Sequence, residues 1–182
     1  MLFLFYPGLV KLGLMNTLCD TCCQVTRTGI KISPPDCEPP FHLIHGRCLF
    51  VNNVNTGSWE EMRDICIIFG GDLAKIDSAD LLDDLIRYIE DNDQVFYLNN
   101  VHYWIGASDT DHENYWKWTD LTPVTLGARF WAVMCPGHNL RPQSDNAALN
   151  CALMDAGYYY MFADYYCDGH SASLPVGMIC QM

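Results

Sequence analysis

The sequence has few basic residues and no long uninterrupted apolar run. Ten Lys and Arg stand against 22 Asp and Glu among 182 residues, so the formal net charge is -12. Because nucleic acids and anionic membranes are contacted mainly through Lys and Arg, this balance argues against both partners. A membrane-spanning helix needs about 20 apolar residues, and Pro7, Gly8 and Lys11 interrupt the apolar start of the chain. We therefore expect no membrane insertion.

Catalytic motifs and glycosylation sequons are also missing. The sequence contains no GxSxG, HExxH or P-loop pattern and no Asn-x-Ser/Thr sequon. Its paired carboxylates fall on the outer face of a predicted helix, away from any recognisable cleft. We therefore expect a protein that is not an enzyme.

Cysteine, in contrast, is abundant, with ten residues in the chain. Their even number and wide spacing favour disulfides and an extracellular, secreted protein. A zinc site would need a second CxxC pair or histidines at ligand spacing, and only the Cys19, Cys22 and Cys23 group comes close. Residues 1–23 form an apolar leader that resembles a degraded secretion signal, residues 24–36 a polar linker with a Pro-Pro pair, and residues 37–182 the folded domain.

The domain begins with hairpin and helix signals and continues with strands. A hairpin is predicted over 41–51 around His45-Gly46. Ser58 and Glu61 form a capping box for a helix over 58–69, and a second helix with an acidic outer face follows over 78–91. Short strands are predicted over 72–77, 102–108, 116–120, 151–155, 157–163 and 177–182. The stretch 121–150 has no period, and loops of this length in compact domains are usually functional or disordered.

This order of parts resembles the C-type lectin-like domain family over residues 37–182. The resemblance is carried by the hairpin, the two helices, Trp104-Ile105-Gly106, Trp116-Lys117-Trp118-Thr119-Asp120 and the order of six cysteines. It implies a secreted, single-domain lectin of the invertebrate type. The implied fold is α+β, with two helices, small antiparallel sheets and a long loop region. The implied disulfides are Cys37 with Cys48, Cys66 with Cys180, and Cys151 with Cys167.

Four cysteines fall outside this framework. They are Cys19, Cys22, Cys23 and Cys135. Either they pair with one another or they link chains, so a disulfide-linked oligomer is a hypothesis.

Sugar-binding members of this family hold a calcium ion where the long loop meets the last strands. Calcium requires six to eight oxygen ligands. Counting back from Cys151 without gaps places Arg141-Pro142-Gln143 at the ligand triplet and Leu149 at the acid position. A two-residue deletion instead places Gln143-Ser144-Asp145 there, which resembles a galactose-type triplet with Ser in place of Pro. In the gapless register Arg141 cannot ligate calcium. We favour the second register because Pro142-Gln143-Ser144-Asp145-Asn146 is otherwise an unusual loop sequence, although a cis peptide bond is unfavourable without proline.

The second register yields a specific set of site residues. The candidate calcium ligands are Gln143, Asp145, Asn150 and Asp164, whose two charges imply weak affinity, on the order of 0.1 to 1 mM. The candidate carbohydrate-binding residues are Gln143, Asp145, Asn146, Asp164 and Tyr160, because tyrosine rings can stack on sugar rings. In the alternative interpretation Asp145 is an ordinary turn residue and Asp164 an ordinary strand-end residue. At least half of the tyrosines in 158–166 then belong to the core.

The sequence thus predicts a lectin that binds glycans of galactose type, on microbial surfaces in innate immunity, with a degenerate calcium site. The alternative is a calcium-independent module for protein binding or assembly on the same fold.

Overall fold

A computed structural model describes residues 36–92, 101–125, 127–134, 139–143, 146–169, 172 and 175–182. The predicted leader 1–23 and the linker up to residue 35 lie outside these residues. So do the four surplus cysteines, Cys19, Cys22, Cys23 and Cys135, and their pairing stays a prediction. Within the described part of the chain, no helix is long and apolar enough to cross a membrane.

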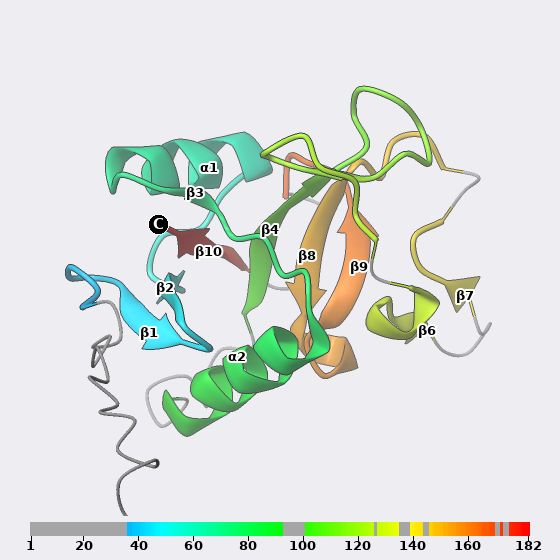
Figure 1. Cartoon of the computed structure of the whole chain (residues 1–182). Coiled ribbons are helices and arrows are strands. Elements are labelled where there is room, and N and C mark those ends of the chain that lie inside the picture. Colours follow the sequence, from blue (N-terminus) through cyan, green and yellow to red (C-terminus); the bar gives the residue numbers. More distant parts are fainter. Residues whose placement is uncertain are drawn as a thin grey trace, which may run out of the picture. The chain divides into compact units, whose positions relative to one another are not determined.

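An eight-stranded sheet forms the centre of the folded region (Figure 1). Its neighbouring strands are antiparallel except β10 and β4, which run parallel with Val176 opposite His102. The predicted α+β fold is confirmed. Most strands join one mixed sheet, because the C-terminal strand enters between β2 and β4, and β6 (Val133–Met134) and β7 (Asn139–Leu140) form a separate small antiparallel sheet. The main path is β1 (His42–Ile44), β2 (Arg47–Asn52), β10 (Val176–Gln181), β4 (His102–Ser108), β8 (Cys151–Asp155) and β9 (Met161–Tyr165), with β3 (Asp72–Leu73) beside β10 and β5 (Lys117–Trp118) beside β4.

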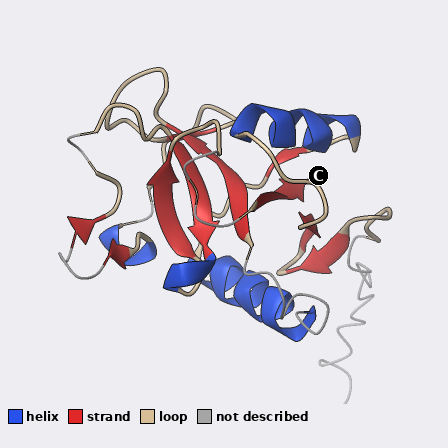
Figure 2. Cartoon of the chain, turned by 180° about the vertical axis from the view of Figure 1, so that it is seen from behind, coloured by secondary structure: helices blue, strands red, loops and turns tan. Residues whose placement is uncertain are grey.

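Two helices, α1 (Trp59–Ile68) and α2 (Ala79–Asn92), lie on opposite sides of this sheet (Figures 1 and 2). The predicted capping box is confirmed: Ser58 Oγ accepts the Glu61 N–H at 3.2 Å, and the Glu61 carboxylate accepts the Ser58 N–H at 2.9 Å. These bonds satisfy amides that a helix start otherwise leaves without partners. The leucines of α2 face inward and most of its acids face solvent, as its period predicts.

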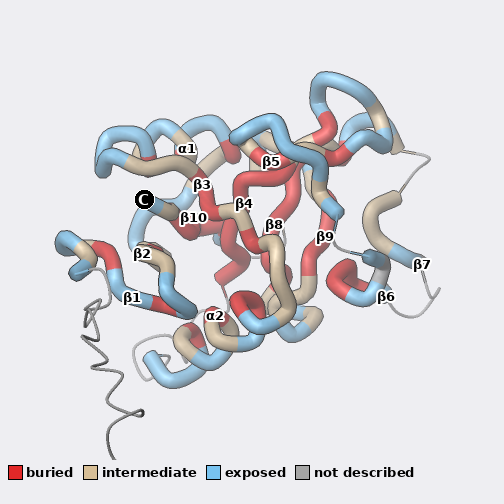
Figure 3. The backbone as a smooth tube through the Cα atoms, in the orientation of Figure 1, coloured by how far each residue is buried: buried red, intermediate tan, exposed pale blue. Residues whose placement is uncertain are grey.

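The core is densest along β4 and β8, where nearly every residue is buried (Figure 3). Strands covered on both faces lose the alternation of apolar and polar residues, which explains the continuous apolar runs in these segments. The three disulfides implied by the family resemblance are confirmed. They are Cys37–Cys48, Cys66–Cys180 and Cys151–Cys167.

The tyrosine-rich segment before β9 differs from the predicted strand over 157–163. Ala156–Tyr158 forms a 3-10 turn capped by Asp155, and Tyr159 and Tyr160 have φ values of 56° and 59°. The strand therefore begins only at Met161. Of the five tyrosines, Tyr158, Tyr160 and Tyr165 are partly buried against the core, whereas Tyr159 and Tyr166 are 88% and 41% exposed.

The disulfides differ in the length of chain that they close, and we expect their contributions to stability to differ accordingly. Cys66–Cys180 spans 114 residues and Cys37–Cys48 spans 11. Loop-closure entropy predicts losses of about 5 and about 3 kcal/mol when each is replaced by an alanine pair. Urea unfolding of Cys66→Ala/Cys180→Ala and Cys37→Ala/Cys48→Ala measures both losses, and a larger loss for the hairpin pair would contradict this ranking.

Candidate functional site

The long loop returns to the sheet beside β9. Its 3-10 turn Ala128–Phe130 is followed by Ala132, whose N–H donates to Phe162 O at 2.7 Å. The short strands β6 (Val133–Met134) and β7 (Asn139–Leu140) pair in this loop, and the Arg141 N–H then donates to Ala132 O at 3.0 Å. These backbone bonds place the residues after β7 against the outer strand of the main sheet.

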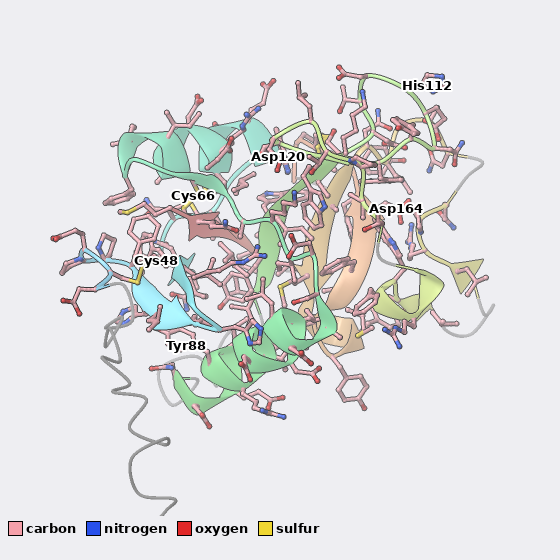
Figure 4. All side chains as sticks on the ribbon, in the orientation of Figure 1. Cys48, Cys66, Tyr88, His112, Asp120 and Asp164 are labelled. Atoms are coloured by element: carbon pink, nitrogen blue, oxygen red, sulfur yellow. A yellow bond between two sulfur atoms is a disulfide. The ribbon has the colours of Figure 1, made fainter. Side chains whose placement is uncertain are left out.

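Arg141 and Asp164 form an ion pair at this junction. Arg141 Nη1 lies 3.0 Å from Asp164 Oδ1, and the side chains are only 12% and 0% exposed. The other carboxylate oxygen, Oδ2, accepts the Gln143 N–H at 2.9 Å. Figure 4 shows Asp164 on β9, on the side that faces the β6–β7 segment. Both carboxylate oxygens are therefore engaged, one by a cation and one by a backbone amide.

The triplet placed next to Asp164 is Arg141-Pro142-Gln143, which is the gapless register. The Arg141–Pro142 peptide bond is cis. Gln143 contacts Asp164 through its backbone N–H rather than through an amide oxygen. The favoured register Gln143-Ser144-Asp145 extends to Ser144 and Asp145, which lie outside the described residues, so its ligand role for Asp145 stays a prediction.

The other predicted site residues are more dispersed. Asn146 forms a turn, in which its Oδ1 accepts the Ala148 N–H and its backbone O accepts the Leu149 N–H. Asn150 donates its amide to Ala147 O at 3.2 Å. Tyr160 precedes β9 and its ring lies 6.0 Å from that of Tyr103. Because Asp164 lies near the other end of the same strand, these geometries do not bring Tyr160 into the predicted sugar site.

Calcium does not fit the carboxylate of Asp164 in this arrangement. The ion would need oxygen ligands in a shell of six to eight, but both oxygens of Asp164 already accept hydrogen bonds and a guanidinium lies beside them. A calcium ion on Asp164 would also lie beside the Arg141 guanidinium, and the two cations would repel each other. In the described part of the chain, no group of three His, Cys, Asp or Glu side chains could hold a metal ion.

Asp109 is a buried acid that the sequence analysis did not single out. It is 4% exposed, its Oδ2 accepts the Asn114 N–H at 2.9 Å, and its backbone N–H donates to Asn150 O at 3.2 Å. The Oδ1 atoms of Asp109 and Asn150 are both buried without a hydrogen-bond partner. Burial, reinforced by the charges of Glu113 and Asp164, raises the pKa of Asp109. The two unpartnered oxygens of Asp109 and Asn150 are too few for a calcium shell. The only feature of the sequence that could have pointed to Asp109 is the acid-rich run 109–113.

Comparisons with known proteins agree with this fold. The model of the Lectin C-type domain family matches residues 55–180. Human "C-type lectin domain family 4 member C" is 24% identical over 148 residues, which cover 80% of this chain and 59% of that protein. The chain thus spans less than two thirds of the length of this curated relative.

Two solved structures illustrate what the fold supports in other proteins. A "calcium-independent type II antifreeze protein" is 27% identical with a TM-score of 0.56, over 81% of this chain and 94% of that one. An "SPL-1 - GlcNAc complex" has 20% identity and a TM-score of 0.60, over 82% and 97% of the two chains. The second similarity concerns the fold alone.

Replacing Arg141 should destabilise the domain because it leaves Asp164 ionised and buried without a counter-charge. We expect Arg141→Gln to lower the free energy of unfolding by about 3 to 5 kcal/mol. Arg141→Gln/Asp164→Asn should lose less, because the buried charge is then absent while the Gln143 N–H keeps an acceptor. Denaturant unfolding of the wild type, Arg141→Gln, Asp164→Asn and the double variant gives the coupling energy. Equal losses in Arg141→Gln and the double variant would exclude a functional ion pair.

Asp109 should make stability depend on pH. Its folded pKa is raised, so the folded state binds the proton more tightly than the unfolded state, and stability falls as pH rises from the unfolded value of about 3.9 through the folded one. Asp109→Asn should therefore raise the melting temperature at pH 7, with the gain disappearing near pH 3. Thermal melts in chelator across this range measure it, and a variant that is less stable at every pH would contradict it.

Proposed function

Because the chain belongs to the Lectin C-type domain family, we propose that it is a secreted, non-enzymatic recognition domain. In this proposal Asp164 holds no calcium ion, and the domain binds its ligand without one. The observation that carries this proposal is the buried ion pair between Arg141 and Asp164. Metal-dependent sugar binding needs a carboxylate that is open to a cation and to sugar hydroxyls. Here a side chain of the protein itself supplies the cation.

A partner protein is the ligand class that best suits this arrangement. Without a metal to coordinate vicinal hydroxyls, the junction of loop and sheet offers side-chain hydrogen bonds, apolar contact and charge, as protein interfaces do. The neighbouring fold described as a calcium-independent antifreeze protein supports the view that the scaffold operates without the ion. The three disulfides support an extracellular location.

Glycan binding is a second candidate, favoured by the exposed tyrosines. Tyr159 is 88% and Tyr166 41% exposed, and exposed aromatic faces can stack on sugar rings. The similar fold in a complex with GlcNAc supports this candidate. Galactose-type glycans and microbial surfaces remain the specific targets that the sequence suggests.

The proposal predicts that calcium has no effect on stability or retention. A ligand that binds only the folded state raises its melting temperature, so the wild type should melt at the same temperature in millimolar calcium and in chelator. Any retention on galactose or mannose resin should survive the chelator.

Arg141→Gln is the matched variant for this measurement. Removing the guanidinium leaves one oxygen of Asp164 without its partner, so if the ion pair is what excludes calcium, a calcium-dependent rise in melting temperature should be seen in Arg141→Gln and not in the wild type. A calcium-dependent rise in the wild-type melting temperature, or release of the wild type from the resin by chelator, would contradict the proposed function.

A further inference from the structure

A cleft of about 500 Å³ lies away from Arg141 and Asp164, between the first turn of α1 and the loop that follows β4. Figure 1 shows this loop, which leads into β5, passing the beginning of α1. The volume is within the range of binding sites for small molecules or for one or two side chains. The cleft is lined by aromatic, hydroxyl and charged residues, so it is neither a wholly apolar groove nor a bare charge cluster.

The walls of the cleft are fixed by hydrogen bonds to the fold. Trp59 donates its indole N–H to Ile105 O at 2.9 Å. Trp118 closes a tight turn, because its backbone N–H donates to Thr122 O and its O accepts the Leu121 N–H. Both tryptophans line the cleft and are at least nine-tenths buried. A preformed wall reduces the entropy lost when a ligand binds.

The basic residues of the cleft are already engaged. Arg63 donates to both carboxylate oxygens of Asp72, each at 2.9 Å, and its guanidinium lies 5.4 Å from the ring of Trp59. Lys117 Nζ lies 5.3 Å from the ring centre of Tyr115. The Tyr115 ring therefore already has a cation of the chain beside it, although the residue is 52% exposed.

Two acids of the cleft have no such partners. Glu60 and Asp111 are exposed, and neither carboxylate forms a hydrogen bond or ion pair with any residue that the structure describes. Glu60 lies in the first turn of α1, where an acid also suits the helix dipole, but Asp111 lies in the loop and has no such role. Both acids therefore line the same cleft as Trp59, Tyr115 and Trp118, in a protein of net charge -12.

We propose that this cleft binds a basic segment of a partner protein, whose Arg or Lys side chains pair with Glu60 and Asp111. The two carboxylates complement the charge of the incoming side chains, and the aromatic lining of the cleft complements their aliphatic stems. This inference rests on the proposed function as a protein-recognition domain and names the chemistry of the partner.

The test uses the full chain and a labelled synthetic peptide of alternating Arg and Gly, with an alternating Glu and Gly peptide as the control ligand. Fluorescence anisotropy measures affinity, and amide chemical shifts locate the contact. The basic peptide should bind and shift the amides around Tyr115 and Lys117, the acidic peptide should not bind, and affinity should fall with added salt.

Matched variants separate the cleft from the general negative charge. Glu60→Gln/Asp111→Asn should weaken binding about tenfold, which corresponds to about 1.4 kcal/mol. Asp83→Asn/Glu90→Gln removes the same number of charges from exposed positions on α2 and should change affinity by less than about twofold. Equal weakening in both pairs would overturn the proposal, as would absence of binding or shifts confined to other surfaces.

Two further measurements distinguish a wrong cleft assignment from a wrong proposed function. An N-acetylglucosamine oligomer that shifts the cleft amides when the basic peptide does not would make the cleft a sugar site and overturn the proposal. Peptide binding that requires calcium would contradict the proposed function while leaving the cleft assignment intact. Calcium-independent binding that is insensitive to Glu60→Gln/Asp111→Asn would contradict the cleft assignment alone.

Discussion

The insertion of the last strand into the middle of the sheet is the constraint on which the rest of the fold depends. β10 pairs antiparallel with β2 and β3 and parallel with β4, so it joins segments that are distant in sequence. Gly177 lets the backbone of β10 approach β2 closely, because a Cβ there would collide with Asn52 O. Cys66–Cys180 then ties the strand to α1. The two helices and both ends of the long loop are positioned only once this strand is in place.

The long loop shows how this frame places an internal ion pair at a residue that the sequence predicted to be a calcium ligand. The loop is hydrogen-bonded to β9 through Ala132, and it presents Arg141 to Asp164 where both are shielded from solvent. A buried carboxylate must be neutralised, by a proton, a metal or a cationic side chain. A guanidinium is permanently charged and its planar shape matches a carboxylate. The site is thus neutral by itself, and an external cation would have to displace a group that is covalently part of the chain.

The sequence predicted the parts of the fold that depend on local pattern. The capping box at Ser58 and Glu61 and the apolar stripe of α2 are set by residues three or four positions apart, and the disulfides followed from the order of cysteines in a known family. The tyrosine segment was harder, because its alternation resembles a strand while Tyr159 and Tyr160 adopt left-handed backbone angles. The register of the loop was harder still, since the contact between Arg141 and Asp164 crosses 23 residues. The structure places Arg141 beside Asp164, whereas the ligand role of Asp145 in the favoured register stays a prediction.

The same reasoning explains why the acidic excess has different consequences at different positions. Where a buried acid has a cationic partner, as Asp164 has, the charge serves stability. Asp109 is buried with one carboxylate oxygen unpartnered, and its charge opposes folding. Where acids lie on the solvated face of α2, water screens them and they mainly oppose association with other acidic surfaces. Glu60 and Asp111 are in a third situation, because they are exposed but confined beside aromatic walls. Water is a poorer partner in such a concave, partly apolar setting than on a convex surface, so a cation brought by another protein gains more there than on α2.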